Sequence, residues 1–241
     1  MAKDRRRLIP VPPAAERALD AALDKALAVQ RPLVLGYLDR VRRWHPEYTP
    51  AEVVTQLERR YLTAVIGIGG ASGAAAAVPG VGTTAALASG TAEIAGFVSA
   101  SAMFVLALAE LHGLPVSDPE IRRALVVSVL VGEGGAAALE SAARGEPHWA
   151  KVIARSTPRD RITGINSHLS RLMLHRFGAR QGALFVGRAL PLGIGVAIGA
   201  GGNAALARTA ISVARKAFGP PPAQFPPRVI DVEMPNQPRP A

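Results

Sequence analysis

The sequence predicts an all-α protein, a single bundle-like domain of seven or eight helices with glycine-rich, closely packed members. Three observations support this prediction. Apolar residues recur every three or four positions through most of the chain, and helix caps precede several of these segments. No stretch shows the alternation of apolar and polar residues that is typical of a strand. A length of 241 residues suits one domain.

Helices are predicted within the first 65 residues. Residues 19–27 carry a leucine every four positions, which places the three leucines on one helical face. Pro32 is expected to break or kink this helix, and a second apolar stripe then continues to Trp44. Residues 49–52 read Thr-Pro-Ala-Glu, a capping box, so another helix is expected to begin there.

The central part of the chain is almost free of charge. Residues 61–92 contain no charged side chain, and the glycine-rich residues 78–82 predict a turn between two helices. A helix is expected from Thr83 to His112, with Gly113 as its left-handed C-cap. The second capping box, at residues 117–120, predicts a helix that continues to about Leu139.

The last two predicted helices complete the domain. Thr157 and Pro158 precede a segment with an apolar face, and a final helix is expected between Pro191 and Phe218. We therefore expect one all-helical domain over residues 14–218. Residues 1–13 are expected to be a disordered basic N-terminus. Residues 219–241 contain 8 prolines and are expected to form an extended or disordered tail.

The formal net charge of +10 is unevenly distributed. Residues 61–121 contain four acidic and no basic side chains, whereas residues 122–218 contain 14 basic and 4 acidic ones. Such asymmetry indicates an anionic partner, either a lipid surface or a nucleic acid. Nucleic acid is the less favoured partner, because the basic residues lack interleaved aromatic residues and match no known binding motif.

Three uncharged stretches raise the question of a membrane span. Residues 62–92, 94–109 and 189–207 approach the roughly 20 apolar residues that a spanning helix needs. Glycine and alanine dilute all three, and the first is interrupted by the predicted turn. Buried core helices are therefore the favoured interpretation, and insertion of a hairpin over residues 80–110 remains the alternative.

The final predicted helix has a face of very small residues. Gly195, Gly199 and Asn203 recur at intervals of four, so they line one narrow face. This pattern favours close packing of another helix, with Asn203 hydrogen bonding across the contact. The alternative is a ligand-binding groove. Glu93, a single acid between two uncharged stretches, could then contribute a buried carboxylate, although a structural ion pair is the favoured role.

No pattern of catalytic residues emerges. The chain has no cysteine, which excludes disulfides, thiolate zinc sites and cysteine nucleophiles. The five histidines show no metal-binding spacing, and no nucleophile elbow, phosphate-binding loop or paired-carboxylate motif is present. We therefore expect no metal or other cofactor, and an enzyme is not supported.

Residues 149–161 combine a tryptophan with basic side chains. Trp149 lies beside Lys151 and Arg155, and Arg159 and Arg161 follow. A helix with an apolar edge and a basic edge is typical of a segment that lies on an anionic membrane. The alternative is a surface helix whose tryptophan is tucked into the core.

Four segments resemble the EcsC family of bacterial proteins. They read LTAVIGIGGASG (62–73), AAVPGVG (76–82), LHGLPVSDPEIRRALVVSVLVG (111–132) and LPLGIGVAIGAGGNAALARTAISVARKAF (190–218). The similarity covers roughly residues 50–218, and its most specific part is the last segment. It implies an all-helical fold and no established activity. Because the founding member is encoded with an ABC transporter, it also implies a membrane-protein partner such as a transporter.

These observations lead to one expected function. We expect a non-enzymatic, membrane-associated protein that docks on anionic lipid through basic helices. No apolar segment typical of a secretory signal is present at the start. We therefore expect a cytoplasmic location, peripheral to or partly inserted in the inner face of the cell membrane. A small-molecule or lipid-binding protein, or an enzyme with its pocket against the glycine-rich helix, is the alternative. The sequence leaves the oligomeric state open.

Overall fold

The chain folds into α-helices connected by short loops, as predicted. The computed structural model describes residues 13–76, 83–114, 118–187 and 194–227, and no strand occurs in these ranges. Eight helices lie within them: α1 (Pro13–Trp44), α2 (Pro50–Ala76), α3 (Thr83–Leu111), α4 (Pro119–Val131), α5 (Glu133–Ala142), α6 (Trp149–Ser156), α7 (Arg159–Gly187) and α8 (Ile194–Phe218).

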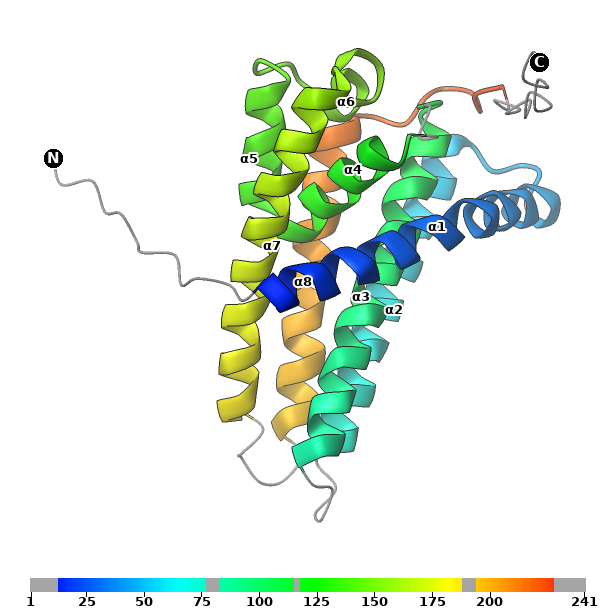
Figure 1. Cartoon of the computed structure of the whole chain (residues 1–241). Coiled ribbons are helices and arrows are strands. Elements are labelled where there is room, and N and C mark those ends of the chain that lie inside the picture. The colour runs from blue at the N-terminus through cyan, green and yellow to red at the C-terminus, as the bar shows by residue number, and fades with distance from the viewer. Residues whose placement is uncertain (1–12, 77–82, 115–117, 188–193, 228–241) are drawn as a thin grey trace, which may run out of the picture.

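Four long helices set the long axis of the bundle. In Figure 1, α2, α3, α7 and α8 run along this axis, and α1 crosses it over one side. Helices α5 and α6 lie at one end of the bundle. At the other end of the bundle lie the end of α2, the start of α3, the end of α7 and the start of α8. The 29 residues of α7 span about 43 Å at 1.5 Å per residue. The basic segment at α6 is therefore far from the end of α2 and the start of α3.

The core is built from aliphatic and aromatic side chains of every helix. The second half of α3 is fully inside it, since Phe104, Leu106 and Leu108 are almost inaccessible to solvent. The part of the uncharged stretch 94–109 that lies in the second half of α3 is therefore a buried core helix. The Tyr61 ring stacks on Phe104 with 4.5 Å between centroids. The Tyr61 hydroxyl lies 2.8 Å from Ser101 Oγ, and burial raises the pKa of Tyr61 to about 12.

The capping box predicted at residues 49–52 is confirmed, whereas in the segment 117–120 the capping residue of α4 is Asp118 and Ser117 lies outside the described residues. The Glu52 carboxylate accepts hydrogen bonds from the backbone N–H and the hydroxyl of Thr49 at 2.7 and 2.8 Å. The Thr49 hydroxyl in turn accepts from the N–H of Glu52. At the start of α4, Asp118 accepts from the N–H of Glu120 at 2.8 Å. Gly113 has the expected left-handed conformation after α3.

Two boundary predictions need correction. Helix α1 runs through Pro32 to Trp44 without ending, so of the two predicted outcomes, a break or a kink, the break does not occur. The helix predicted to reach Leu139 ends at Val131, and α5 begins at Glu133. The chain turns sharply here because α5 comes very close to α4. A Cβ atom on Gly135 would lie only 2.4 Å from the carbonyl oxygen of Ser128. Only glycine permits this approach.

The folded domain extends past Phe218, the predicted boundary. Gly219 ends α8 with a φ of 76°, and any Cβ there would meet the His148 ring at 2.6 Å. Residues 219–227 then continue without regular structure, and Phe225 packs against the hydrophobic core. This part of the tail is therefore extended and attached. The turn predicted at residues 78–82 lies outside the described residues.

No helix within the described residues is long and apolar enough to cross a bilayer.

Candidate functional site

Helix α8 packs against α2. Asn203 is 1% exposed, and its Nδ2 donates a hydrogen bond to the carbonyl oxygen of Val65 at 3.3 Å. Most of the other buried residues described on α8 are alanines, including Ala207 and Ala210. The side of α8 at Asn203 therefore forms a helix contact, in agreement with the favoured interpretation. The surroundings of Gly195 and Gly199 and the side chain of Glu93 lie outside the described residues.

An ion pair that the sequence analysis did not identify holds the same two helices. Arg215 Nε donates to Glu58 Oε1 at 2.8 Å, and its Nη2 donates to Oε2 at 2.6 Å. The Glu58 side chain is only 10% exposed. The hydrogen bonds and charge of Glu58 raise the pKa of Arg215. The two residues are 157 positions apart, so no local sequence signal links them.

The structure of α6 contradicts one of the predicted membrane contacts, that of Trp149. Trp149 is 1% exposed and belongs to the core together with Ile153. It therefore does not form the surface contact proposed for it, because the apolar edge of α6 is used to pack against the domain. The helix begins after His148, whose Nδ1 lies 3.3 Å from the carbonyl oxygen of Lys216. The end of α8 thus fixes the start of α6.

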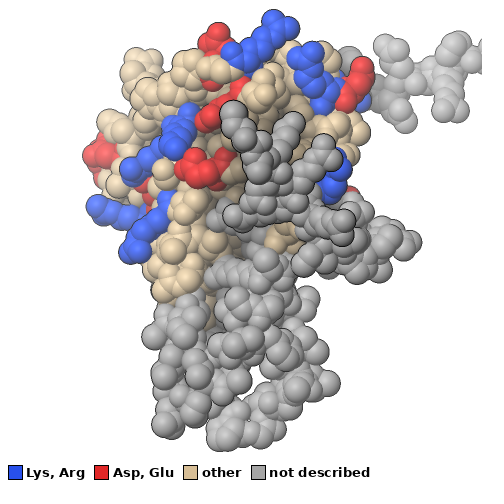
Figure 2. Space-filling view, turned by 90° about the vertical axis from the view of Figure 1, so that its left-hand side faces the viewer, with Lys and Arg blue, Asp and Glu red and all other residues tan. Residues whose placement is uncertain are grey.

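The basic residues predicted around α6 retain access to solvent. Arg155 and Arg161 are exposed and Lys151 is partly exposed. No ion pair involves these three side chains within the ranges that the structure describes. Figure 2 shows Lys and Arg over the upper half of the face toward α5 and α7, with Asp and Glu between them. The face is mixed in charge, and these three cations are among the basic side chains that have no ion pair within the described ranges.

Arg159 differs from its basic neighbours because it joins α7 to α4. Its Nε and Nη2 each lie 2.9 Å from Asp118 Oδ2, while the Arg159 side chain stays 80% exposed. Burial alone would raise the pKa of Asp118. The hydrogen bonds from the Glu120 and Ile121 backbone and from Arg159 outweigh burial, so the pKa of Asp118 is lowered.

A polar cleft borders the contact between α4 and α7. It has a volume of about 500 Å³, and its lining includes Glu120 and Arg123 of α4 and Asn166, Ser167, Ser170 and Arg171 of α7. Asn166 Nδ2 donates to the Glu120 backbone oxygen at 3.0 Å and to Glu120 Oε2 at 2.7 Å. Arg123 Nη2 donates to Ser170 Oγ at 3.2 Å. Sequence reasoning missed this cleft, because it depends on which faces of α4 and α7 meet.

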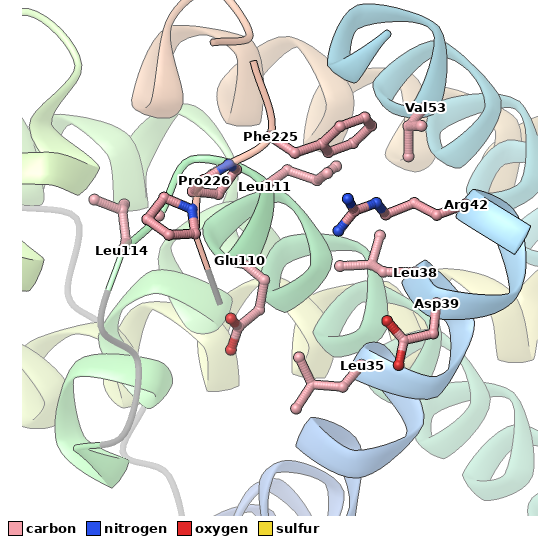
Figure 3. A pocket seen from close by; sticks show the side chains of 12 residues that line it. Leu35, Leu38, Asp39, Arg42, Val53, Glu110, Leu111, Leu114, Phe225 and Pro226 are labelled. Atoms are coloured by element: carbon pink, nitrogen blue, oxygen red, sulfur yellow. The ribbon is translucent and has the colours of Figure 1, made fainter. Parts of the chain in front are cut away.

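The tail closes a second, smaller cleft between α1 and α3. Figure 3 shows Phe225 and Pro226 beside Leu111, with Arg42 of α1 extending toward them. The Arg42 guanidinium lies 4.7 Å from the centroid of the Phe225 ring, a cation–π contact. The space enclosed here is about 60 Å³, and a more open groove of about 770 Å³ adjoins it along Arg42, Arg43 and residues 225–227. The tail is attached to the domain at this cleft.

Within the described ranges, no three His, Asp or Glu side chains converge in a way that could hold a metal ion. The half-buried His112 lies against Phe218, with 5.3 Å between the ring centroids and 40° between the ring planes. Burial lowers the pKa of His112.

Comparisons with known proteins add no relative: no family model, no characterised protein and no solved structure matches the chain.

Proposed function

We propose that this chain is a non-enzymatic, EcsC-like protein that docks peripherally on an anionic membrane through the exposed basic residues of α6 and the start of α7. The observation that carries this proposal is the set Lys151, Arg155 and Arg161, which face solvent without ion-pair partners among the described residues. Basic side chains near an anionic bilayer each contribute about 1 kcal/mol.

The fold restricts how such docking occurs. Because Trp149 and Ile153 are buried, α6 has no large apolar side chain to insert, and the contact is electrostatic. The end of α2 and the start of α3 lie at the opposite end of the bundle from α6 (Figure 1). A membrane that touches the α6 end therefore leaves these helix ends out of the contact.

The EcsC resemblance supports the same setting. It suggests a location at the inner face of the cell membrane and a membrane-protein partner such as a transporter. The location and the membrane-protein partner are both part of the proposal. The exposed cations support only the docking on an anionic membrane.

Flotation with lipid vesicles tests the docking. We expect the full chain to float with anionic vesicles at low salt, to remain behind with neutral vesicles, and to be released as salt rises. The double variant Arg155→Glu and Arg161→Glu should lose most of this binding. A matched control, Arg43→Glu with Arg59→Glu, makes the same change in charge at exposed positions of α1 and α2 and should retain clearly more. No flotation of the unmodified chain, or equal loss in both variants, would contradict the proposal.

A further inference from the structure

Residues 219–227, which we call the strap, connect the end of α8 to the cleft between α1 and α3 (Figure 1). Five of these nine residues are prolines, which have no N–H to donate. Among the described residues, the one backbone–backbone hydrogen bond of the strap joins the N–H of Gly219 to the Arg215 oxygen at 3.0 Å. None of the nine residues is buried. The strap is therefore held on the surface by side-chain contacts.

Two residues of the strap occupy the cleft. Figure 3 shows the Phe225 ring beside Leu111, and the Arg42 guanidinium lies 4.7 Å from the centroid of this ring. Pro226 follows over Gly113, where a Cβ atom would lie only 3.0 Å from the Pro226 Cβ. An extended, proline-containing segment in an apolar cleft is a recurring form of peptide recognition, because such a segment loses little conformational freedom on binding.

The strap fills this cleft incompletely. A space of about 60 Å³ stays enclosed between the strap and the helices, and an open groove of about 770 Å³ continues along Arg42 and Arg43. Phe225 and Pro226 are partly exposed, and Pro227 is exposed. A ligand with the same aromatic anchor and a longer or larger flank gains contacts here that the strap does not make.

The charges around the cleft favour a peptide over an anionic partner. Asp39 and Glu110 balance Arg42 and Arg43 among the residues that line the cleft and the groove, so the formal net charge of these four is zero. A nucleic acid or an anionic lipid would gain no net attraction from them. The apolar anchor, not charge, therefore selects the occupant.

The strap of a second copy is a poorer occupant than a segment of another protein. Exchange of straps between two copies forms the same contacts that each copy makes alone. It also costs the free motion of one molecule relative to the other. A segment of another protein with a better fit is not limited in this way.

We propose that the cleft between α1 and α3 binds an extended segment of another protein, in which an aromatic residue is followed by two prolines, and that the strap competes for the same site. The aromatic ring of the partner occupies the position of Phe225 against Arg42 and Leu111, and its prolines lie over Gly113. The strap is then an autoinhibitory contact, released when the partner binds. This proposal does not depend on the membrane docking proposed above.

Fluorescence anisotropy with a labelled peptide of residues 223–229 (AQFPPRV) tests the site. We expect weak binding to the unmodified chain, and about tenfold tighter binding to the full chain with Phe225→Ala, because a tethered competitor acts at high effective concentration. The same peptide with alanine in place of phenylalanine should bind neither chain. Equal affinity of the two chains, or no binding to Phe225→Ala, would overturn the proposal. Phe225 follows the last helix and is partly exposed, so circular dichroism should show unchanged helix content.

A matched pair of arginine variants locates the peptide. Added to Phe225→Ala, Arg42→Ala should weaken peptide binding about threefold, since the cation–π contact is lost. Arg59→Ala removes the same charge from an exposed position of α2 and should leave binding unchanged. Equal effects of the two arginine variants would place the peptide outside this cleft and overturn the proposal.

A dye on the strap tests the competition without altering an anchor residue. The chain has no cysteine, and Gln224→Cys provides an exposed attachment point beside Phe225. Saturating AQFPPRV should change the dye emission, and the alanine peptide should not. Binding of AQFPPRV without a change in emission would overturn the competition. Sedimentation tests the other occupant, because a dimer of the unmodified chain that Phe225→Ala abolishes would assign the cleft to a second copy and overturn the proposed partner.

Discussion

Two asparagines are buried between helices, and they serve their interfaces differently. Asn203 lies between α8 and α2 and donates across the contact to the backbone oxygen of Val65. Asn166 lies between α7 and α4, and although Nδ2 donates to Glu120, its Oδ1 is buried without a hydrogen-bond partner among the described residues. The same kind of side chain thus donates across one interface and keeps an unsatisfied acceptor in the other.

The residues around each asparagine explain this difference. Around Asn203, α8 contributes alanines such as Ala207 and Ala214 to its buried side, and side chains of this size let two helix backbones approach closely. Around Asn166, α7 contributes Ser167, Ser170 and Arg171, which line a polar surface depression beside the α4–α7 contact. One interface therefore packs mainly through small apolar residues, and the other is bordered by polar ones.

The largest effect on stability is expected from removal of the Glu58–Arg215 ion pair between α2 and α8. Arg215→Ala leaves the nearly buried Glu58 carboxylate without its partner, so we expect the free energy of unfolding to fall by about 2 kcal/mol. Arg208→Ala, on the same helix and exposed, should change it by less than about 0.5 kcal/mol. Urea denaturation measures both. Equal effects would show that the pair contributes nothing beyond a surface charge.

The next largest effects on stability are expected from replacing the two asparagines. These variants test the comparison between the two interfaces directly. Asn203→Ala removes an interhelical hydrogen bond and leaves a cavity, so it should lower the free energy of unfolding by about 1.5 kcal/mol. Asn166→Ala should lower it by only about 0.5 kcal/mol, because it also removes an unsatisfied acceptor. The same denaturation experiment ranks them. A larger loss for Asn166→Ala would reverse the roles that we assign.

The smallest effect concerns Asp118 at the α4–α7 side, and it depends on pH. The pKa of Asp118 is lowered in the folded chain, so its contribution is present above its unfolded pKa and is lost as pH falls through the folded value. Asp118→Asn should be less stable by up to about 1 kcal/mol at neutral pH. The difference should shrink below about pH 4, the usual range of an aspartate. A difference that is constant with pH would exclude ionisation of Asp118 as its cause.

Local signals in the sequence were sufficient for most of the secondary structure. The capping box at Thr49, the left-handed Gly113 and the end of α8 at Gly219 each depend on a few adjacent residues, and each was predicted. The break at Gly132 was missed, because it follows from the close approach of Gly135 to Ser128. That contact forms only after α4 and α5 pack together.

The candidate site was less predictable, because it depends on neighbours in space. A helix with an apolar and a basic edge has the same sequence pattern whether its apolar edge meets lipid or core, and Trp149 meets the core. The Glu58–Arg215 pair and the Asn166 cleft join distant segments. Phe225 did carry a signal, since it is a lone aromatic residue between prolines, and it marks where the tail attaches.

Because the chain contains no cysteine, a single fluorophore can report directly on the proposed docking face. An environment-sensitive dye attached through Ser156→Cys lies at an exposed position of α6, and the same dye at Thr55→Cys lies at an exposed position of α2. On addition of anionic vesicles at low salt, we predict a change in emission at position 156 that high salt reverses, and little change at position 55. Equal responses at both positions, or no response at position 156 while the protein is bound to vesicles, would contradict docking through α6 and α7.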